Sequence, residues 1–476
     1  MTELLVSDRF LAAADPGAPV VHGDPLTYGE LRERVAASAS ALRAELPPRA
    51  NVLLAMAWSS EAIVAYLATM RAGLAAIPID PGSTRQAVER ILGETGAAAS
   101  IGDFGSLAPL LDRVPTWPLG TREGGPGSPS PLPEAEAPAL VLYTSGTTAA
   151  PKGVVLSHGN LAANTASILA AVPMLRSDVV ALVLPLHHSY GLSVLHTTLA
   201  TGAKLAPMPP FAVPSDCVRG LASARATVFP GVPFHFGALL GRPTGFDRNG
   251  LPDLRCAMVA GGPMPTRLAA AFAQRFPGVE LHVMYGQTEA TARLSALPPG
   301  ELRRHPGSIG RGIPGVELAV LRPNGAEVRP GEIGELYARG ENVMRGYLGD
   351  ETASAEVLTP LGLRTLARSD PAYCPRYEGG VPSRDGAYHQ GTVWPWLIGP
   401  FVDAWLNVNG GDDAHRAEAR RRFLAPLVDH LNVAGLGHVS EIADGDLPHT
   451  PRGCPFQAWS LGELIRALAR TAPSKS

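Results

Sequence analysis

Lysine is the scarcest charged residue of this sequence. It occurs only at Lys152, Lys204 and Lys475, although the 476 residues contain 40 lysines and arginines together. Aspartate and glutamate number 43, so the formal net charge at pH 7 is only −3. A charge this close to balance gives no electrostatic reason to expect a nucleic acid or an anionic membrane as partner. Because lysine is so rare, a lysine inside a polar loop, as Lys152 is, becomes a candidate functional residue.

Cysteines are few, and long apolar runs are lacking. The four cysteines are widely spaced, which favours neither a disulfide framework nor a zinc site, and we interpret them as buried or half-buried thiols. They are Cys217, Cys256, Cys374 and Cys454. No apolar span is long enough to cross a bilayer, and the N-terminus lacks a basic segment followed by a long apolar one. We therefore expect a cytoplasmic protein without a transmembrane segment.

A polar loop that follows an apolar run is the chemically richest stretch. Residues 139–142 read Ala-Leu-Val-Leu, and residues 143–153 read Tyr-Thr-Ser-Gly-Thr-Thr-Ala-Ala-Pro-Lys-Gly. This order indicates a buried strand that leads into a phosphate-binding turn. Glycine lets the backbone approach an anion, hydroxyl and N–H groups donate to phosphate oxygens, and Lys152 supplies a positive charge. The stretch predicts a site for a nucleotide triphosphate, although its spacing is not that of a P-loop NTPase.

The same stretch resembles the phosphate loop of the adenylate-forming superfamily, which contains the AMP-forming acyl-CoA ligases and adenylation domains. The superfamily has glycine at the position of Ala149. The resemblance implies that Lys152 is a catalytic residue and that the loop binds ATP with Mg²⁺, for which Thr148 is a candidate ligand. The expected ATP-binding residues of the loop are Thr144, Ser145, Gly146, Thr147 and Thr148.

Strand-like and helix-like segments alternate before the loop. Apolar runs at residues 52–56, 77–81 and 98–101 indicate strands, and the segments 61–72 and 85–95 between them have helical spacing. This alternation predicts an α/β domain in which helices cover a parallel sheet. Residues 120–138 are rich in Gly, Pro, Ser and Glu, which indicates a surface loop or linker.

Two later strand ends carry candidate site residues. The apolar segment 179–184 leads into Pro-Leu-His-His-Ser-Tyr-Gly, where His188 matches a superfamily histidine at the mouth of the acyl pocket and His187 replaces an aromatic residue. Metal binding by both histidines is disfavoured because adjacent strand residues point to opposite faces, and ordinary loop histidines are the alternative. The segment 254–260 leads into Gly261 and Gly262, which resemble the loop that lines the acyl and adenine sites. Ligands of open parallel sheets bind beyond the carboxyl ends of the strands, so we expect these loops to gather.

The second strong motif is Tyr285-Gly286-Gln287-Thr288-Glu289. It offers an aromatic face for a base, a hydroxyl for a phosphate and a carboxylate for Mg²⁺. It matches the Tyr-Gly-x-Thr-Glu motif of the superfamily in every fixed position. The resemblance implies that Tyr285 stacks on adenine, that Thr288 contacts the α-phosphate and that Glu289 coordinates magnesium. Gly286 and Gln287 are expected to line the same cofactor site.

The resemblance to the superfamily runs from about residue 25 to about residue 359. Its last part, from residue 307 to residue 347, has short strand-like segments with Gly/Pro turns and predicts a small β subdomain. We therefore expect an adenylate-forming large domain over residues 1–360.

The superfamily pattern ends where a hinge and a mobile, lysine-bearing domain would follow. The Gly-Asp of the hinge is absent, and no lysine lies between Lys204 and Lys475. Residues 384–396, 440–442 and 454–460 instead resemble the C-terminal end of bacterial glycogen debranching enzyme, its amylo-α-1,6-glucosidase domain. We expect residues 361–476 to be an all-α fragment of an (α/α) six-hairpin barrel, joined within 361–366, with helices at 399–408, 412–432 and 459–468.

Glu441 matches the catalytic base of that glucosidase domain. Glycoside hydrolysis needs two carboxylates that flank the bond, and the partner acid would lie in the earlier part of the barrel, which this chain lacks. Loop residues of the segment suit glucan contact through aromatic stacking and hydrogen bonds.

These observations favour an acyl-CoA ligase-like protein that activates a carboxylic acid, in the manner of long-chain fatty acid–CoA ligases. The expected cofactors are ATP and Mg²⁺, with coenzyme A as a further candidate. Without the usual hinge and lysine, we expect weak adenylation and little thioester formation. The alternatives are a non-catalytic ATP- or acyl-AMP-binding protein, a nonfunctional fusion product, and a carbohydrate-active protein that binds or debranches glucan.

Overall fold

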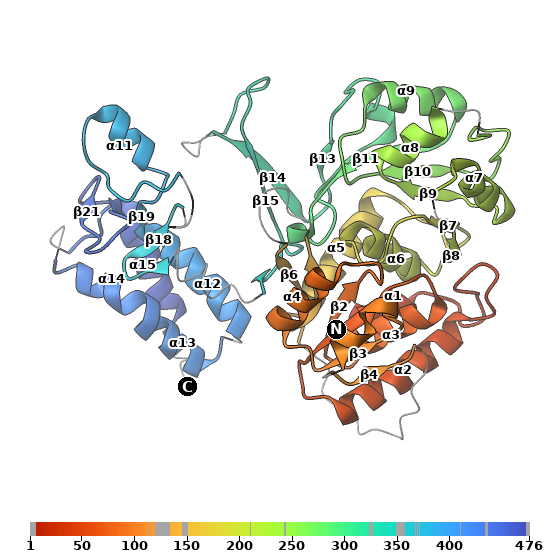
Figure 1. Ribbon diagram of the computed structural model, residues 1–476. Helices are drawn as coiled ribbons and strands as arrows, with labels where there is room; N and C mark the ends of the chain where they lie inside the picture. The colour runs from red at the N-terminus through yellow and green to blue at the C-terminus, as the bar shows by residue number, and fades with distance from the viewer. Residues whose placement is uncertain are drawn as a thin grey trace. The chain divides into compact units, whose positions relative to one another are not determined.

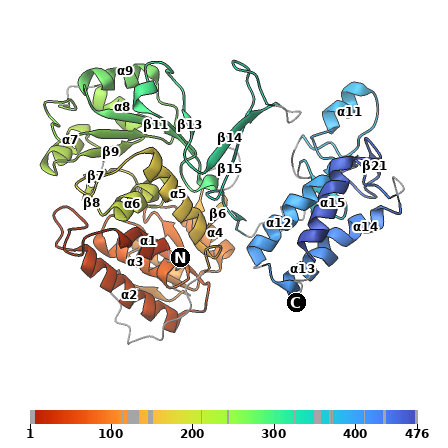
Figure 2. The same ribbon diagram turned by 180° about the vertical axis from the view of Figure 1, so that it is seen from behind.

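The computed structural model falls into two units, Met1–Leu348 and Gly349–Ser476, each of which is described by itself (Figures 1 and 2). The described residues are 6–112, 114–119, 134–144, 151–209, 211–241, 244–322, 327–348, 358–366, 368, 370, 372–409, 411–433 and 437–472. A domain boundary after residue 360 and a join within 361–366 stay predictions.

A mostly parallel sheet forms the N-terminal part of the first unit. In spatial order its strands are β16 (Gly346–Tyr347), β6 (Gly153–Ser157), β5 (Pro138–Tyr143), β2 (Ala75–Ile79), β1 (Asn51–Ala55), β3 (Ala99–Ile101) and β4 (Thr116–Trp117). β1 pairs in parallel with β2 and β3, and β2 pairs in parallel with β5. β6 runs antiparallel to β5, and β16 runs antiparallel to β6. Every residue of β2 is buried, as in a strand that is covered on both faces.

Hydroxyl N-caps begin the helices that connect these strands. The helices are α2 (Tyr28–Glu45), α3 (Ser60–Arg71) and α4 (Arg85–Thr95), after a short α1 (Val6–Ala12). Thr27 and Glu30 form a reciprocal capping box at α2, and Ser59 and Thr84 accept hydrogen bonds from the first turns of α3 and α4. Such caps stabilise a helix by about 1 kcal/mol each. The helices predicted at 61–72 and 85–95 are confirmed by α3 and α4, and with them the α/β fold class.

A second sheet follows in the same unit. Its strands, in spatial order, are β13 (Arg311–Gly312), β12 (Ser295–Leu297), β11 (Glu280–Tyr285), β10 (Cys256–Val259), β9 (Val228–Gly231), β7 (Val179–Leu182) and β8 (Lys204–Pro207). β8, β7, β9, β10 and β11 are parallel, whereas β12 and β13 are antiparallel additions. The hairpin of β14 (Val316–Leu321) and β15 (Glu335–Gly340) supplies the predicted small β element.

The two faces of the second sheet pack against different partners. One face lies on α7 (Pro214–Ser223), α8 (Pro233–Leu240) and α9 (Thr266–Arg275), with an aromatic cluster between sheet and helices. The cluster consists of Phe229, Phe236, Phe246, Phe272 and Phe276. The other face belongs to the core that also contains the first sheet, α5 (His158–Ala171) and α6 (Ser189–Thr201). Both sheets therefore form one continuous unit.

The second unit is mainly helical and has its own core. α12 (Ile398–Asn409), α13 (Asp413–Ala419), a π-helical turn (Arg420–Leu424), α14 (Ala425–His430) and α15 (Ala458–Arg470) confirm the three predicted helical segments, and a shorter α11 (Val381–Ala387) precedes them. Their apolar side chains pack around Val402, Leu424 and Leu464. The segment also contains a sheet of short strands, which the prediction of an all-α fragment did not include. They are β17 (Leu358–Thr359), β18 (Gly362–Arg364), β19 (Val393–Trp394), β20 (Ile442–Ala443) and β21 (Pro451–Arg452). Closure into a six-hairpin barrel stays a prediction.

The cysteines are free thiols, and three of the four are buried or half-buried as predicted. Cys454 is exposed, which corrects that expectation, because it lies in a turn between β21 and α15 rather than in the core. In the part of the chain that the structure describes, no helix is long and apolar enough to cross a membrane.

Replacing Phe272 by alanine tests the aromatic cluster. Phe272 is fully buried and its ring contacts those of Phe236 and Phe276. Its loss should lower the free energy of unfolding by about 3–5 kcal/mol, measured by urea denaturation. The matched control is Phe234→Ala on α8, since Phe234 is 69% exposed, and we expect it to cost about 1 kcal/mol or less. Equal losses for the two variants would contradict this packing.

Candidate functional site

The base of the predicted phosphate loop is formed by the ends of β5 and β6. The backbone N–H of Thr144 donates to the carbonyl of Lys152 at 3.1 Å, so the antiparallel pair closes at these two residues. The hydroxyl of Tyr143, the last residue of β5, donates to Glu94 on α4 at 2.9 Å. Ser145, Gly146, Thr147 and Thr148 lie outside the described residues. The site is therefore built from Thr144, Lys152 and the loops that surround them.

Tyr347 joins the lysine of this loop to the acidic residue of the second motif. The Lys152 ammonium lies over the Tyr347 ring, 4.7 Å from its centroid, and the Tyr347 hydroxyl donates to Oε1 of Glu289 at 3.0 Å. β16 holds Tyr347 in place, because it pairs with β6 in a register that sets Tyr347 opposite Val154. The two motifs, far apart in the sequence, thus meet through one side chain of the segment predicted to form a small β subdomain.

The turn after β11 carries the second motif. β11 ends at Tyr285, and Thr288, Glu289 and Ala290 form a 3₁₀ turn. Gly286 is required there, since a Cβ at this position would lie 1.8 Å from the carbonyl oxygen of Ala292. The hydroxyl of Thr288 lies 3.2 Å from that of Ser189 at the start of α6. Gln287 is exposed, whereas Tyr285, Thr288 and Glu289 are half-buried.

Two buried residues fix the far side of this turn. Asn342 donates to the carbonyl of Ala290 at 3.1 Å, and the hydroxyl of Thr291 donates to the carbonyl of Asn342 at 2.6 Å. Thr291 adopts a φ of 70°, an uncommon conformation for a β-branched residue that this hydrogen bond compensates. The N–H of Met344 also donates to the carbonyl of Glu289 at 2.8 Å. The segment 342–347 therefore positions Glu289 through backbone and side chain.

The histidine pair lies where the chain enters α6. Ser189, the residue after His188, contacts the predicted residue Thr288 through its hydroxyl. Burial lowers the pKa of His188, and burial together with the neighbouring His188 lowers the pKa of His187, while Asp80 opposes both shifts. The two imidazole rings are 4.3 Å apart, and His187 Nε2 lies 3.9 Å from Asp80 Oδ2. Both side chains are therefore favoured in their neutral form.

A cavity of about 470 Å³ adjoins the loop base and the histidines. Its wall combines apolar groups of β2 and α4, such as Ile79 and Ile91, with polar groups of Asp80 and Arg90. Tyr143, Thr144, Pro151, His187 and His188 complete it. This cavity could hold an organic group next to the phosphate loop.

Gly261 and Gly262 follow β10, next in the sheet to the strand that ends at Tyr285. Gly261 has a φ of +80°, a conformation open to glycine, and both residues are exposed. The carboxyl ends of β10 and β11 thus place this turn and the second motif at the same edge of the sheet, as the parallel arrangement predicts.

Glu441 belongs to the second unit and is held by two donors. The hydroxyl of Tyr388 donates to its Oε1 at 2.5 Å, and the N–H of Cys454 donates to its Oε2 at 2.9 Å. Burial, together with the Glu441 carboxylate, raises the pKa of Tyr388, which keeps this donor protonated. A role of Glu441 as a base stays a prediction.

Comparison with known proteins agrees with the geometry of the first unit. The family of AMP-binding enzymes matches residues 10–348. The chain belongs to this family. The family of amylo-alpha-1,6-glucosidase matches residues 349–466, which confirms the second resemblance.

Several curated proteins are similar along most of the chain. A feruloyl-CoA synthase from Amycolatopsis sp is 31% identical over 446 residues, which cover 89% of this chain and 84% of that protein. The 4-coumarate–CoA ligase-like 9 of Arabidopsis thaliana is 30% identical over 365 residues, which cover 71% and 64%. An indoleacetate–CoA ligase of Aromatoleum aromaticum is 30% identical over 307 residues, which cover 64% and 55%.

Solved structures agree with the fold. ATP-bound MatB from Rhodopseudomonas palustris superposes with a TM-score of 0.65 at 26% identity and covers 74% of this chain and 73% of its own. The N-terminal domain of FACL13 from Mycobacterium tuberculosis has a TM-score of 0.67 at 23% identity, covers 75% of this chain and 94% of its own, and supports the fold alone. The prediction of an acyl-CoA ligase-like adenylating protein is confirmed, and the non-catalytic and carbohydrate-active alternatives are not favoured.

The substitution Gly286→Ala should disable this AMP-binding site. Its Cβ would overlap the carbonyl of Ala292, so the turn that carries Thr288 and Glu289 must shift. We expect ATP binding, measured by calorimetry, to weaken at least about tenfold, the loss that follows when a misplaced turn forfeits one charge-assisted hydrogen bond. The control Gly300→Ala adds a Cβ in open space and should bind ATP as the parent does. Unchanged binding in the Gly286 variant would show that this turn does not contact the nucleotide.

Proposed function

We propose that the first unit converts a carboxylic acid and MgATP into an acyl-adenylate and pyrophosphate. The observation that carries the proposal is the meeting of Lys152, Tyr347 and Glu289. Lys152 places a positive charge at the base of the phosphate loop. The Glu289 carboxylate is the hard oxygen ligand that Mg²⁺ prefers. Thr288 and Thr144 supply further donors for phosphate oxygens.

The reaction is an in-line displacement in which the acid attacks the α-phosphate. Such a reaction needs alignment and neutralisation of charge more than covalent help from the protein. We assign Lys152 and the Glu289-bound metal to neutralisation, and Thr288 to the α-phosphate. Tyr285, Gly286, Gln287, Gly261 and Gly262 would surround the nucleoside, together with Ser145, Gly146, Thr147 and Thr148 of the loop. Thr148 is a further proposed Mg²⁺ ligand.

The neutral His188 suits a place beside the acid. Its burial disfavours a second positive charge, and its neighbour Ser189 contacts Thr288, so the histidine lies beside the proposed α-phosphate contact. Coenzyme A as the acceptor and a long-chain fatty acid as the substrate are further parts of the proposal. The names of the relatives support including hydroxycinnamic and indoleacetic acids in any substrate panel. Because no lysine lies between Lys204 and Lys475, we expect adenylation to be slow and thioester formation slower still.

A cytoplasmic location and contact of the second unit with glucan are also proposals.

Acid-dependent ATP–pyrophosphate exchange tests the proposed function. The panel should contain short to long fatty acids and aromatic acids, with Mg²⁺ present. Lys152→Ala and Glu289→Gln should each reduce exchange by at least about tenfold, the value of one interaction with a charged group. Lys204→Ala is the matched control, because Lys204 lies on β8 of the same unit, and it should exchange as the parent does. No exchange with any acid, from a folded protein that binds ATP, would refute the adenylation proposal.

Tyr347→Phe tests the link between the two motifs. The variant keeps the ring beneath Lys152 and removes only the hydroxyl that donates to Glu289. We expect the Mg²⁺ concentration for half-maximal exchange to rise about tenfold, since a hydrogen bond to a charged group contributes about 1.5 kcal/mol. Tyr337→Phe is the matched control, because Tyr337 donates to the exposed Glu335 on β15. An equal Mg²⁺ requirement in both variants would exclude a positioning role of Tyr347.

A further inference from the structure

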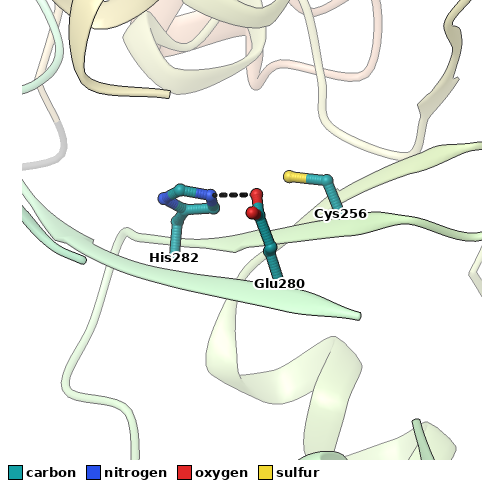
Figure 3. A group of neighbouring side chains, drawn as sticks. All are labelled: Cys256, Glu280 and His282. Carbon is teal, nitrogen blue, oxygen red and sulfur yellow. Dashed lines mark hydrogen bonds and ion pairs between the residues drawn. The ribbon is translucent and has the colours of Figure 1, made fainter. Parts of the chain in front are cut away.

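Three potential metal ligands lie together on one face of the second sheet, away from the AMP-binding site. β10 and β11 pair with Cys256 opposite Glu280 and Met258 opposite His282. Register partners share a face, and residues two apart on a strand do so as well, so Cys256, Glu280 and His282 point to the same side (Figure 3). Cys256 and Glu280 begin their strands, whereas Gly261 and Thr288 follow the strand ends. The cluster therefore lies toward the N-terminal ends of β10 and β11, whereas the AMP-binding site lies beyond their C-terminal ends.

The donor atoms of this cluster are close and differ in burial. The Cys256 sulfur, a Glu280 carboxylate oxygen and a His282 ring nitrogen all lie within 4.8 Å of one another. His282 Nε2 is 3.3 Å from Glu280 Oε2. Cys256 and His282 are 2% and 3% exposed, whereas the Glu280 side chain is 54% exposed. Two of the three donors are thus buried, and the third, the Glu280 carboxylate, is exposed to solvent.

His282 presents its Nε2 to Glu280, and its other ring nitrogen faces away from the cluster (Figure 3). Its Nδ1 is buried and has no hydrogen-bond partner among the described residues. The weak contact between Nε2 and Glu280 is the one described interaction that favours a proton on Nε2. Burial lowers the pKa of His282, which favours the neutral imidazole, while Glu280 opposes this shift. A neutral imidazole is the form that binds metal, and here the nitrogen on the side of Glu280 is Nε2.

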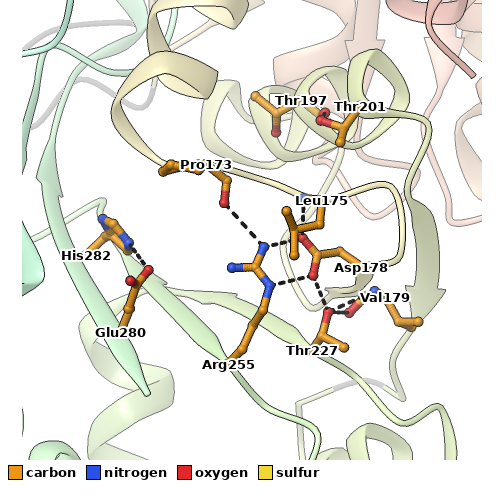
Figure 4. A network of polar contacts seen from close by, with 10 residues as sticks. All are labelled: Pro173, Leu175, Asp178, Val179, Thr197, Thr201, Thr227, Arg255, Glu280 and His282. Atoms are coloured by element: carbon orange, nitrogen blue, oxygen red, sulfur yellow. Dashed lines mark hydrogen bonds and ion pairs between the residues drawn. The ribbon is translucent and has the colours of Figure 1, made fainter. Parts of the chain in front are cut away.

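The nearest positive charges do not fill the cluster. Arg255 is held by Asp178, with Nε 2.7 Å from Oδ1 and a second contact between Nη2 and Oδ2 (Figure 4). Asp178 is 1% exposed and also accepts from Thr227 at 2.8 Å. The buried Arg293 lies on the same side of the sheet, against Met258; burial, with Glu280 and Asp178, raises the pKa of the Cys256 thiol, whereas Arg255 and Arg293 lower it. Because both arginines are positively charged, they repel a metal ion that is held only by neutral ligands. A metal ion therefore needs two anionic ligands here.

We propose that Cys256, Glu280 and His282 bind a divalent transition metal ion of the Zn²⁺ type. Thiolate, imidazole and carboxylate are the donors that Zn²⁺ takes in proteins, and three of them leave a fourth position for water. Zn²⁺ has no redox step, and its two charges are balanced by the thiolate and the carboxylate. Burial raises the pKa of the Cys256 thiol to about 12, so metal binding transfers the thiol proton to solvent as the metal–sulfur bond forms.

Titration of the full chain with Co²⁺ alone tests this proposal. After treatment with a chelator, Co²⁺ should bind with a stoichiometry of one and give the near-ultraviolet charge-transfer absorption of a cobalt–thiolate bond, and Zn²⁺ should abolish it by displacement. Cys256→Ser should remove the band. Glu280→Gln and His282→Gln should weaken Co²⁺ binding at least about tenfold, since even an outer-shell partner contributes about 10–100-fold.

The other cysteines provide the controls. Cys217→Ser removes another buried thiol of the same unit and should leave the band unchanged, and Cys454→Ser removes the exposed thiol of the second unit with the same expected result. A band that persists in Cys256→Ser, or that disappears in Cys454→Ser, would overturn the proposal. So would the absence of any band in the parent protein. Because Glu280 is exposed, Glu280→Gln should remain folded, and unchanged Co²⁺ affinity in that variant would also overturn it.

Discussion

The hydrogen bond from Tyr347 to Glu289 is the contact that joins the two sequence motifs of the candidate AMP-binding site. It connects a residue of β16, at the edge of the first sheet, with the turn that follows β11 in the second sheet. The same ring lies under Lys152, so a cation and a carboxylate are held on either side of one side chain. A Lys152–Glu289 ion pair would neutralise both groups, whereas this arrangement separates them and leaves each charge available to phosphate or Mg²⁺.

Sequence patterns predicted the parts of the site that depend on strand ends. An apolar run followed by Gly, Ser or Thr identified the ends of β5, β10 and β11, because a buried strand must leave the core where polar residues begin. The parallel order of β10 and β11 then brings Gly261 and Tyr285 to one edge. Asn342 and Tyr347 were not identified, since they act through antiparallel pairing and turns that bring residues more than 50 positions apart together. Neither has a sequence signal beyond a polar side chain near glycine.

The cysteines illustrate the same limit. Their wide spacing favoured neither a disulfide framework nor a zinc site, because spacing along the chain detects only ligands that are carried close together in sequence. The cluster of Cys256, Glu280 and His282 instead draws on two strands, and its ligands converge only because β10 and β11 pair with Cys256 opposite Glu280. A one-residue slip in register would send the β11 side chains to the opposite face. Register is a tertiary property, so it cannot be read from spacing along the chain.

The two units differ in how their acidic residues are held. Glu289 accepts one side-chain hydrogen bond from Tyr347, which leaves carboxylate capacity for a metal, whereas each oxygen of Glu441 accepts a donor from Tyr388 or Cys454. The carboxylate of the second unit thus joins Tyr388, next to α11, to the turn before α15, while that of the first unit has one oxygen without a side-chain hydrogen bond from another described residue. The AMP-binding family match covers the first unit, and residues 349–472 contain no lysine, so in the proposed adenylation Lys152 is our candidate for neutralising charge during the attack.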